Sequence, residues 1–124
     1  MPQKITIRKE SFDREAALEH FRGDVEALRE SARSFLRDCP KQMAEIRDAI
    51  SCSNDKHLER SSYRLDWLLS TLGAAAAFDA ALQLEKLGRE GDLTDAEEAY
   101  AKLESEIERL KTCLQNGLMK ATAD

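Results

Sequence analysis

Apolar residues recur along this chain at steps of three and four, interrupted by short polar breaks. That spacing places them on one face of an α-helix, where they form a stripe that must be buried. The long stretches with this pattern are residues 25–50, 55–72, 74–89 and 96–114. Four amphipathic helices joined by short connections pack most simply side by side around their stripes. The pattern therefore predicts an all-α protein, an antiparallel up-down four-helix bundle.

A shorter amphipathic stretch, residues 12–21, comes before the first long helix. It predicts a short N-terminal helix packed on the bundle, with Phe12, Ala16 and Phe21 facing inward. The following glycine and aspartate end this helix. No repeat or linker divides the chain, so we expect a single domain over residues 1–124, with its core at about 12–116.

Other local signals refine these helices. Pro40 lies inside the first long stretch, and we expect it to kink or split the helix because proline removes a backbone donor. Thr94 and Glu97 have the spacing of a capping box at the start of the last helix. In the third long stretch the spacing turns Leu82 inward with its apolar neighbours, and Glu85 partly so.

Composition and charge exclude several classes of function. Charged residues make up 35% of the chain and the net charge is −5, which disfavours nucleic acid and anionic membrane surfaces. Residues 1–10 lack the apolar core of a secretion signal, and no stretch is long enough to span a membrane, so we expect a cytoplasmic protein. The three cysteines have no CxxC spacing, which favours packing over disulfides or metal.

Two large aromatic residues depart from the amphipathic pattern. On the helix that begins near Asp55, a rotation of about 100° per residue puts Tyr63 and Trp67 opposite the leucine stripe. Both rings therefore face solvent and form a docking surface for a protein partner, since such residues anchor interfaces. The alternative is that the rings lean over neighbouring apolar side chains. The polar and charged residues expected around them are Arg60, Arg64, Asp66 and Ser70.

The order of these features resembles the histidine-containing phosphotransfer (HPt) domains of bacterial phosphorelays, over roughly residues 12–114. In that family the central motif reads approximately Ala-His-x-Leu-Lys-Gly, followed five residues later by Gly-Ala. The corresponding run here is SYRLDW at residues 62–67, followed by Gly73 and Ala74. Leu65, Gly73 and Ala74 match the motif, and Leu65 and Gly73 are its structural residues. The histidine, lysine and glycine of the motif do not match.

The resemblance implies that Tyr63 occupies the position of the phosphate-accepting histidine. Imidazole suits phosphotransfer because it is largely neutral near pH 7 and presents a nitrogen lone pair. A phenol is a weak nucleophile unless a base activates it. The family's lysine corresponds to Asp66, whose charge we expect to disfavour a phosphoryl group, and the family's glycine corresponds to Trp67. We therefore expect no catalytic residue, no enzyme activity and no carried phosphate.

No other residues offer a clear site of chemistry. His57 lies six residues before Tyr63, and His20 lies on the short N-terminal helix, so neither occupies the motif position. Their separation gives no case for a metal site, and we expect no cofactor. The sequence also lacks a phosphate-binding glycine loop and other common catalytic motifs.

Three hypotheses follow for the function. In the favoured one, the chain is a pseudo-phosphotransfer domain that binds a response-regulator receiver domain or a sensor kinase without carrying phosphate. In the second, phosphotransfer persists on an unexpected acceptor, His57 or Tyr63. In the third, the chain is a helical interaction or oligomerisation module unrelated to phosphorelays. The sequence leaves open whether the protein is a monomer or a homodimer.

Overall fold

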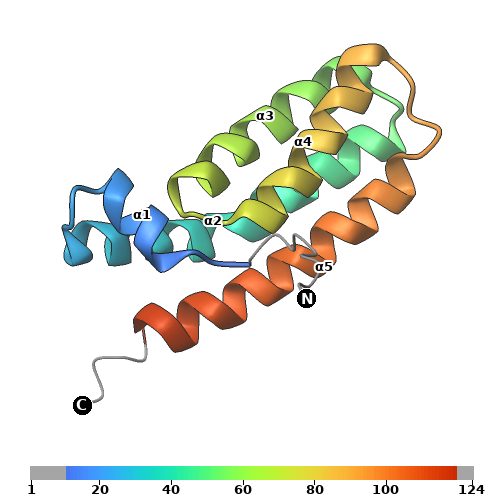
Figure 1. Ribbon diagram of the computed structural model, residues 1–124. Coiled ribbons are helices and arrows are strands. Elements are labelled where there is room, and N and C mark those ends of the chain that lie inside the picture. Colours follow the sequence, from blue (N-terminus) through green and yellow to red (C-terminus); the bar gives the residue numbers. More distant parts are fainter. Residues whose placement is uncertain (1–10, 120–124) are drawn as a thin grey trace, which may run out of the picture.

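The computed structural model describes residues 11–119, and the expectations that concern residues 1–10 and 120–124 lie outside that range. The described part is entirely helical, without a strand, which confirms the predicted all-α class. A π-helical turn continues the last α-helix (Figure 1). The elements are α1 (Arg14–His20), α2 (Val25–Ser51), α3 (Asp55–Thr71), α4 (Ala75–Glu90), α5 (Ala96–Leu114) and η1 (Gln115–Met119).

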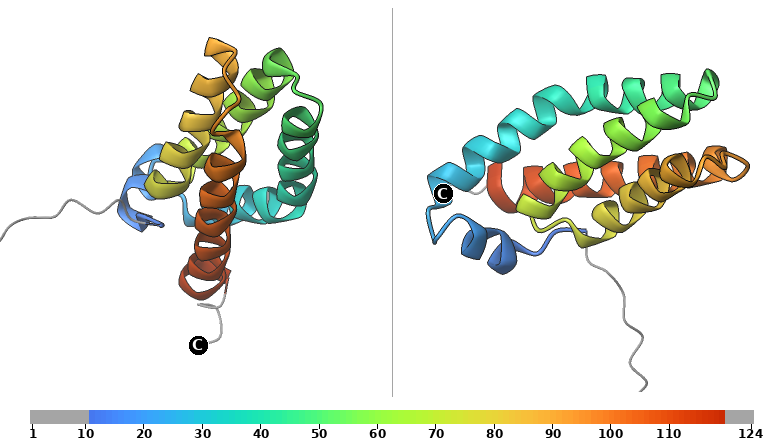
Figure 2. Two further views of the ribbon diagram at one scale, coloured as in Figure 1. Left: turned by 90° about the vertical axis from the view of Figure 1, so that its right-hand side faces the viewer. Right: turned by 90° about the horizontal axis from the view of Figure 1, so that it is seen from above.

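The four long helices lie alongside one another, and the short α1 lies near one end of α2 (Figures 1 and 2). Helix α3 packs against α4, α4 against α5, and α2 against both α3 and α5. The four long helices therefore enclose a common core. Its largest fully buried side chains are Leu28, Ile46, Leu58, Leu65, Leu69, Leu72, Leu84, Leu103, Ile107, Leu110, Leu114 and Leu118.

Side-chain caps define where three of the helices begin. Asp13, Asp24 and Asn54 each accept a hydrogen bond from a backbone N–H in the first turn of α1, α2 and α3. The expected capping box of Thr94 and Glu97 is wrong. Helix α5 has no side-chain cap, because the Thr94 backbone N–H and hydroxyl donate to Asp92 and the Glu97 carboxylate instead pairs with α2.

Pro40 does not split α2, which remains one helix of 27 residues. Figure 2 shows that this helix curves along its length. The proline ring is exposed, whereas Phe35, Cys39 and Met43 on either side of it are buried in the core. The packed stripe holds both halves of the helix in place despite the missing backbone donor.

Helix α1 differs from its predicted orientation. Ala17 is fully buried and Ala16 is exposed, so the expectation for Ala16 is wrong, whereas Phe12 and Phe21 are half-buried against the core. The physical reason is an anchor at the start of the helix, where the Asp13 N–H donates to the Gly73 carbonyl at 2.9 Å. This bond fixes the rotation of α1 against the turn between α3 and α4.

Helices α3 and α4 approach closely at Gly88. A methyl group at this position would lie 2.7 Å from the Glu59 backbone nitrogen and 2.8 Å from the Asp55 carbonyl oxygen. Glycine therefore permits the observed packing of the two helices. On the same helix, Leu82 is 39% exposed, so its predicted inward orientation is wrong, and Glu85 is half-buried, as its spacing predicts. The rotation that brings Gly88 against α3 leaves Leu82 at the solvent edge of the interface.

Candidate partner-docking face on helix α3

The exposed aromatic residues lie on α3, held by the burial of its opposite side. Tyr63 is 57% exposed and Trp67 is 60% exposed, whereas Leu58, Leu65 and Leu69 are completely buried. The aromatic residues are four positions apart and so lie one above the other on the helix surface. The structure thus places both rings in solvent, as the helical rotation predicts. We call Tyr63 and Trp67, together with the exposed Arg60, Arg64 and Ser70 around them, the α3 face.

The charged groups of the α3 face are arginines. Arg60 and Arg64 are both exposed, and a guanidinium nitrogen of Arg64 lies 3.7 Å from a carboxylate oxygen of Glu45 on α2. This ion pair is solvent-exposed, so it restrains the arginine only weakly. Ser70 is also exposed, one turn beyond the aromatic pair. The α3 face therefore combines apolar rings with positive charge, although the chain as a whole is acidic.

The expectation that Asp66 belongs to this exposed face is wrong. Its side chain is only 4% exposed and is turned toward Glu85 of α4. Burial, the hydrogen bond to Glu85 and the charge of Glu85 together raise the pKa of Asp66 to about 9, although Arg89 partly opposes them. Asp66 is therefore protonated near pH 7. The helical spacing alone could not predict the burial of Asp66, because a polar residue beside a leucine stripe can face either solvent or a neighbouring helix.

Leu65 and Gly73, two of the residues that match the family motif, have structural positions. Leu65 is completely buried in the core. Gly73 has a φ of +66°, which favours glycine, and a side chain there would meet the Asp13 carbonyl oxygen at 2.5 Å. The turn from α3 to α4 thus depends on glycine for both its backbone conformation and the close approach of α1.

Leu82 also belongs to this region, although its spacing predicts an inward orientation. It lies on α4 three positions before Glu85, which faces Asp66, so it lies on the α3-facing edge of α4. Tyr63, Trp67 and Leu82 are the large hydrophobic residues with exposed side chains in the described part of the chain. All three lie on the adjacent helices α3 and α4, which extends the α3 face toward α4.

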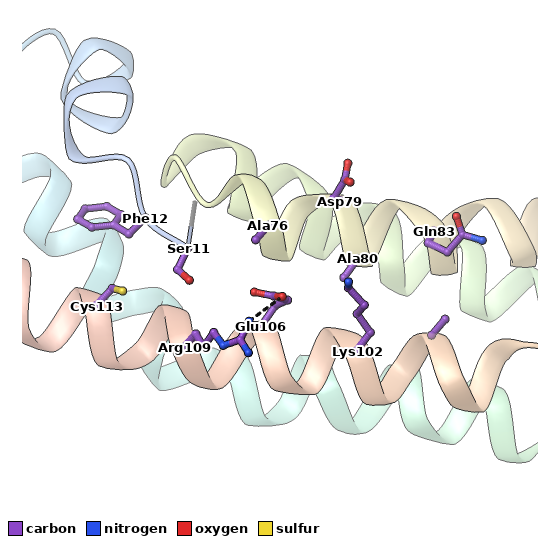
Figure 3. Close-up of a pocket in the computed structure, with 11 residues that line it drawn as sticks. Ser11, Phe12, Ala76, Asp79, Ala80, Gln83, Lys102, Glu106, Arg109 and Cys113 are labelled. Carbon is purple, nitrogen blue, oxygen red and sulfur yellow. Dashed lines mark hydrogen bonds and ion pairs between the residues drawn. The ribbon is translucent and has the colours of Figure 1, made fainter. Parts of the chain in front are cut away.

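A concave region lies between α4 and α5 (Figure 3). This groove has a volume of about 1060 Å³. Small residues of α4, Ala76 and Ala80, lie along one side, and Lys102, Glu106 and Arg109 project from α5. Glu106 pairs with Arg109 at 3.2 Å, as the dashed line in Figure 3 marks.

Neither histidine lies in the α3 face. His57 is half-buried in the first turn of α3, and His20 is exposed at the end of α1. Among residues 11–119, no three histidine, cysteine or acidic side chains come together as metal ligands. Within the same range, none of the helices is sufficiently long and apolar to cross a membrane.

An all-helical fold of four long helices, with an exposed face on the second of them, defines the class of small helical-bundle domains. The comparison with protein families identifies the class, because the Hpt domain model matches residues 30–113. The chain belongs to the Hpt domain family, whose members act as phosphotransfer carriers that interact with receiver domains and kinases in phosphorelays.

The fold is also similar to a solved structure, the crystal structure of histidine-containing phosphotransfer protein B (HptB) from Pseudomonas aeruginosa PAO1. The TM-score is 0.81 and the sequence identity is 14%, with 89% of this chain and 96% of that chain covered. At this identity the similarity establishes the fold alone. A comparison with curated proteins finds no match.

Proposed function

We propose that this chain is a pseudo-phosphotransfer domain of a phosphorelay, which binds a receiver domain or a sensor kinase through the α3 face without carrying phosphate. The observation that carries this proposal is the exposed Tyr63 at the position where the family motif has its histidine. The Hpt family match supports the phosphorelay setting. The exposed aromatic pair supports a binding role, because tryptophan and tyrosine are common interface anchors.

The lack of phosphotransfer rests on the chemistry of Tyr63. Its phenol requires a base to become an effective nucleophile, and His57 lies about 9 Å away along the helix axis and well around the helix. The repulsion expected from Asp66 does not contribute, because that carboxyl is buried and neutral near pH 7. Arg60 and Arg64 would in fact favour a nearby anion. The tyrosine itself, rather than surface charge, is therefore the barrier to phosphotransfer.

Calorimetric titration tests the binding role. Receiver domains and sensor-kinase domains from the cell of origin are titrated with the wild-type protein and with Trp67→Ala. We expect a loss of about 2 kcal/mol in binding free energy, the magnitude of an interface anchor, which is about thirtyfold in Kd. Glu104→Ala, an exposed substitution on α5, is the control and should leave Kd unchanged. Equal binding by Trp67→Ala and the wild type would rule out the α3 face as the docking site.

Intact-mass measurement tests the absence of phosphotransfer. The protein is incubated with a phosphorylated receiver domain, and we expect no phosphate adduct. An adduct on the wild-type protein would instead support a working carrier that uses Tyr63 or His57. Peptide mapping of the adduct would distinguish these two acceptors.

The exposed hydrophobic residues also support the second candidate, a helical oligomerisation module. Tyr63, Trp67 and Leu82 would then be buried between two copies of the chain. Light scattering over a range of concentrations separates the two candidates. A protein that stays monomeric at every concentration would exclude the oligomerisation module.

A further inference from the structure

A buried pair of carboxyl groups joins α3 to α4 directly beside the α3 face. Asp66 precedes Trp67 in the chain and is 4% exposed, and the side chain of its partner Glu85 is 14% exposed. Arg89 lies at the edge of this pair, 3.4 Å from Glu85 and 3.9 Å from Glu59. Three carboxyl groups thus share one guanidinium group. Full ionisation would leave excess negative charge in a largely buried interface.

The surrounding groups do not compensate that charge. One carboxyl oxygen of Asp66 has no hydrogen-bond partner, and neither does the completely buried hydroxyl oxygen of Ser62, one turn earlier on α3. Helix α2 contributes Glu45, which pairs with Arg64 and not with Asp66. Buried carboxylates without donors are unfavourable, so one proton must remain between Asp66 and Glu85.

This proton connects the two helices that carry the exposed hydrophobic residues. While it is present, one carboxyl donates to the other and holds α3 against α4. Its loss converts the donor–acceptor pair into two facing negative charges, which repel one another in a poorly solvated place. Trp67 follows Asp66 immediately, and Leu82 lies one turn before Glu85, so separation of the carboxyls displaces both sides of the exposed surface.

We propose that the proton shared by Asp66 and Glu85 is a pH-dependent latch, which keeps the α3 face in its binding geometry and releases it when the proton is lost. The latch itself is a property of this chain, whereas its effect on a partner rests on the function proposed above. The two consequences are measured separately.

The fluorescence of Trp67, the single tryptophan of the chain, reports on the latch without any partner. Emission is recorded from about pH 5 to about pH 9.5, with Asp66 about three-quarters ionised at the upper limit, since its pKa is about 9. We expect a one-proton step in the wild type that is absent in Asp66→Asn, in which an amide donor replaces the carboxyl. Glu90→Gln, an exposed substitution on α4, should retain the step.

Two results would overturn the latch. One is wild-type emission that stays constant over this range, and the other is a step of equal size and midpoint in Asp66→Asn. Tyrosine ionisation cannot imitate the expected result, because the variant keeps both tyrosines. If Asp66→Asn does not fold, NMR titration of the Asp66 side-chain carbon in the wild type decides instead. A carboxyl that titrates near its usual value of 3.8 would then overturn the proposal.

A second measurement tests the consequence for binding. Kd for a receiver domain is measured at about pH 7 and about pH 9.5, with the wild type and with Asp66→Asn. We expect the rise in Kd at the higher pH to be about fourfold larger for the wild type than for Asp66→Asn. Binding that weakens equally in both proteins would refute the link between latch and face. If no receiver domain or kinase binds at any pH, the proposed function fails, while the fluorescence step still decides whether the latch exists.

Discussion

Gly88→Ala tests whether the close approach of α3 and α4 holds the bundle together. The added methyl group would lie 2.7 Å from the Glu59 backbone nitrogen and 2.8 Å from the Asp55 carbonyl oxygen. Carbon in ordinary contact lies about 3.5–4.0 Å from its neighbours, so the helices must separate by roughly 1 Å. The obstructing atoms belong to the backbone, and no side-chain rotation relieves the contact.

The magnitude follows from two opposing effects. Overpacking of a buried interface costs about 1–3 kcal/mol, and a clash with backbone favours the upper value. Alanine is a better helix former than glycine by up to about 1 kcal/mol, which offsets part of the loss. We therefore expect Gly88→Ala to lower the free energy of unfolding by about 2 kcal/mol.

Urea unfolding followed by circular dichroism measures this difference. Gly117→Ala is the matched control, because a methyl group there would meet only Phe12 at 3.8–3.9 Å, an ordinary contact. The control should be at least as stable as the wild type, because it gains helix propensity without a clash. If Gly88→Ala were as stable as the control, the interface would tolerate extra volume, and the argument for tight packing would fail.

Three further predictions concern caps, thiols and pH. Asn54→Ala should lower the free energy of unfolding by about 1 kcal/mol, because α3 loses its side-chain cap, whereas Asp95→Ala should have little effect, since Asp95 makes no side-chain cap bond. Urea unfolding compares the two. An alkylating agent should modify the exposed Cys52 much faster than Cys39, because burial raises the pKa of the Cys39 thiol and shields it from the reagent. Mass spectrometry of the peptides measures both rates. Equal rates would contradict the burial of Cys39. Burial and Glu85 raise the pKa of Asp66 from 3.8 to about 9, so the folded protein keeps a proton that the unfolded chain loses. The contribution of this group to stability is therefore complete below about pH 4 and declines as the pH rises toward 9, by up to about 1.4 kcal/mol per pH unit. Unfolding at several pH values should show a steeper decline for the wild type than for Asp66→Asn, and parallel curves would refute the raised pKa.

Much of the helical architecture could be predicted from the sequence, because the apolar stripes are long and regular. On α2 the apolar residues at steps of three and four are all buried, namely Leu28, Ala32, Phe35, Cys39, Met43, Ile46 and Ile50. On α3 the same reasoning places the leucine stripe inside and both large aromatic rings outside. Each of these results depends only on the helical period, which the sequence contains directly.

The errors occur where a neighbouring helix decides the outcome. Asp66 and Leu82 lie at the edges of their apolar stripes, where a small rotation of the helix moves a side chain between solvent and an interface. That rotation is set by the close contact at Gly88, a feature of two helices that no single period reveals. Similarly, Glu97 has the spacing of a capping residue, but its carboxylate pairs with Arg47 at 2.7 Å instead. Long-range pairs of this kind override local signals.

The departures from ordinary packing concentrate in one short segment of α3. Residues 62–67 contain the two exposed aromatic rings and two of the buried oxygen atoms that lack hydrogen-bond partners. Exposed rings and unsatisfied buried oxygens do not stabilise a bundle, and an apolar side chain at position 66 would meet the needs of packing better. Such departures are expected where a protein performs its function rather than where it only folds. The sequence resemblance aligns the same segment with the family's central motif. Local packing and the sequence resemblance, which are independent arguments, therefore both favour this segment of α3 for the proposed docking function.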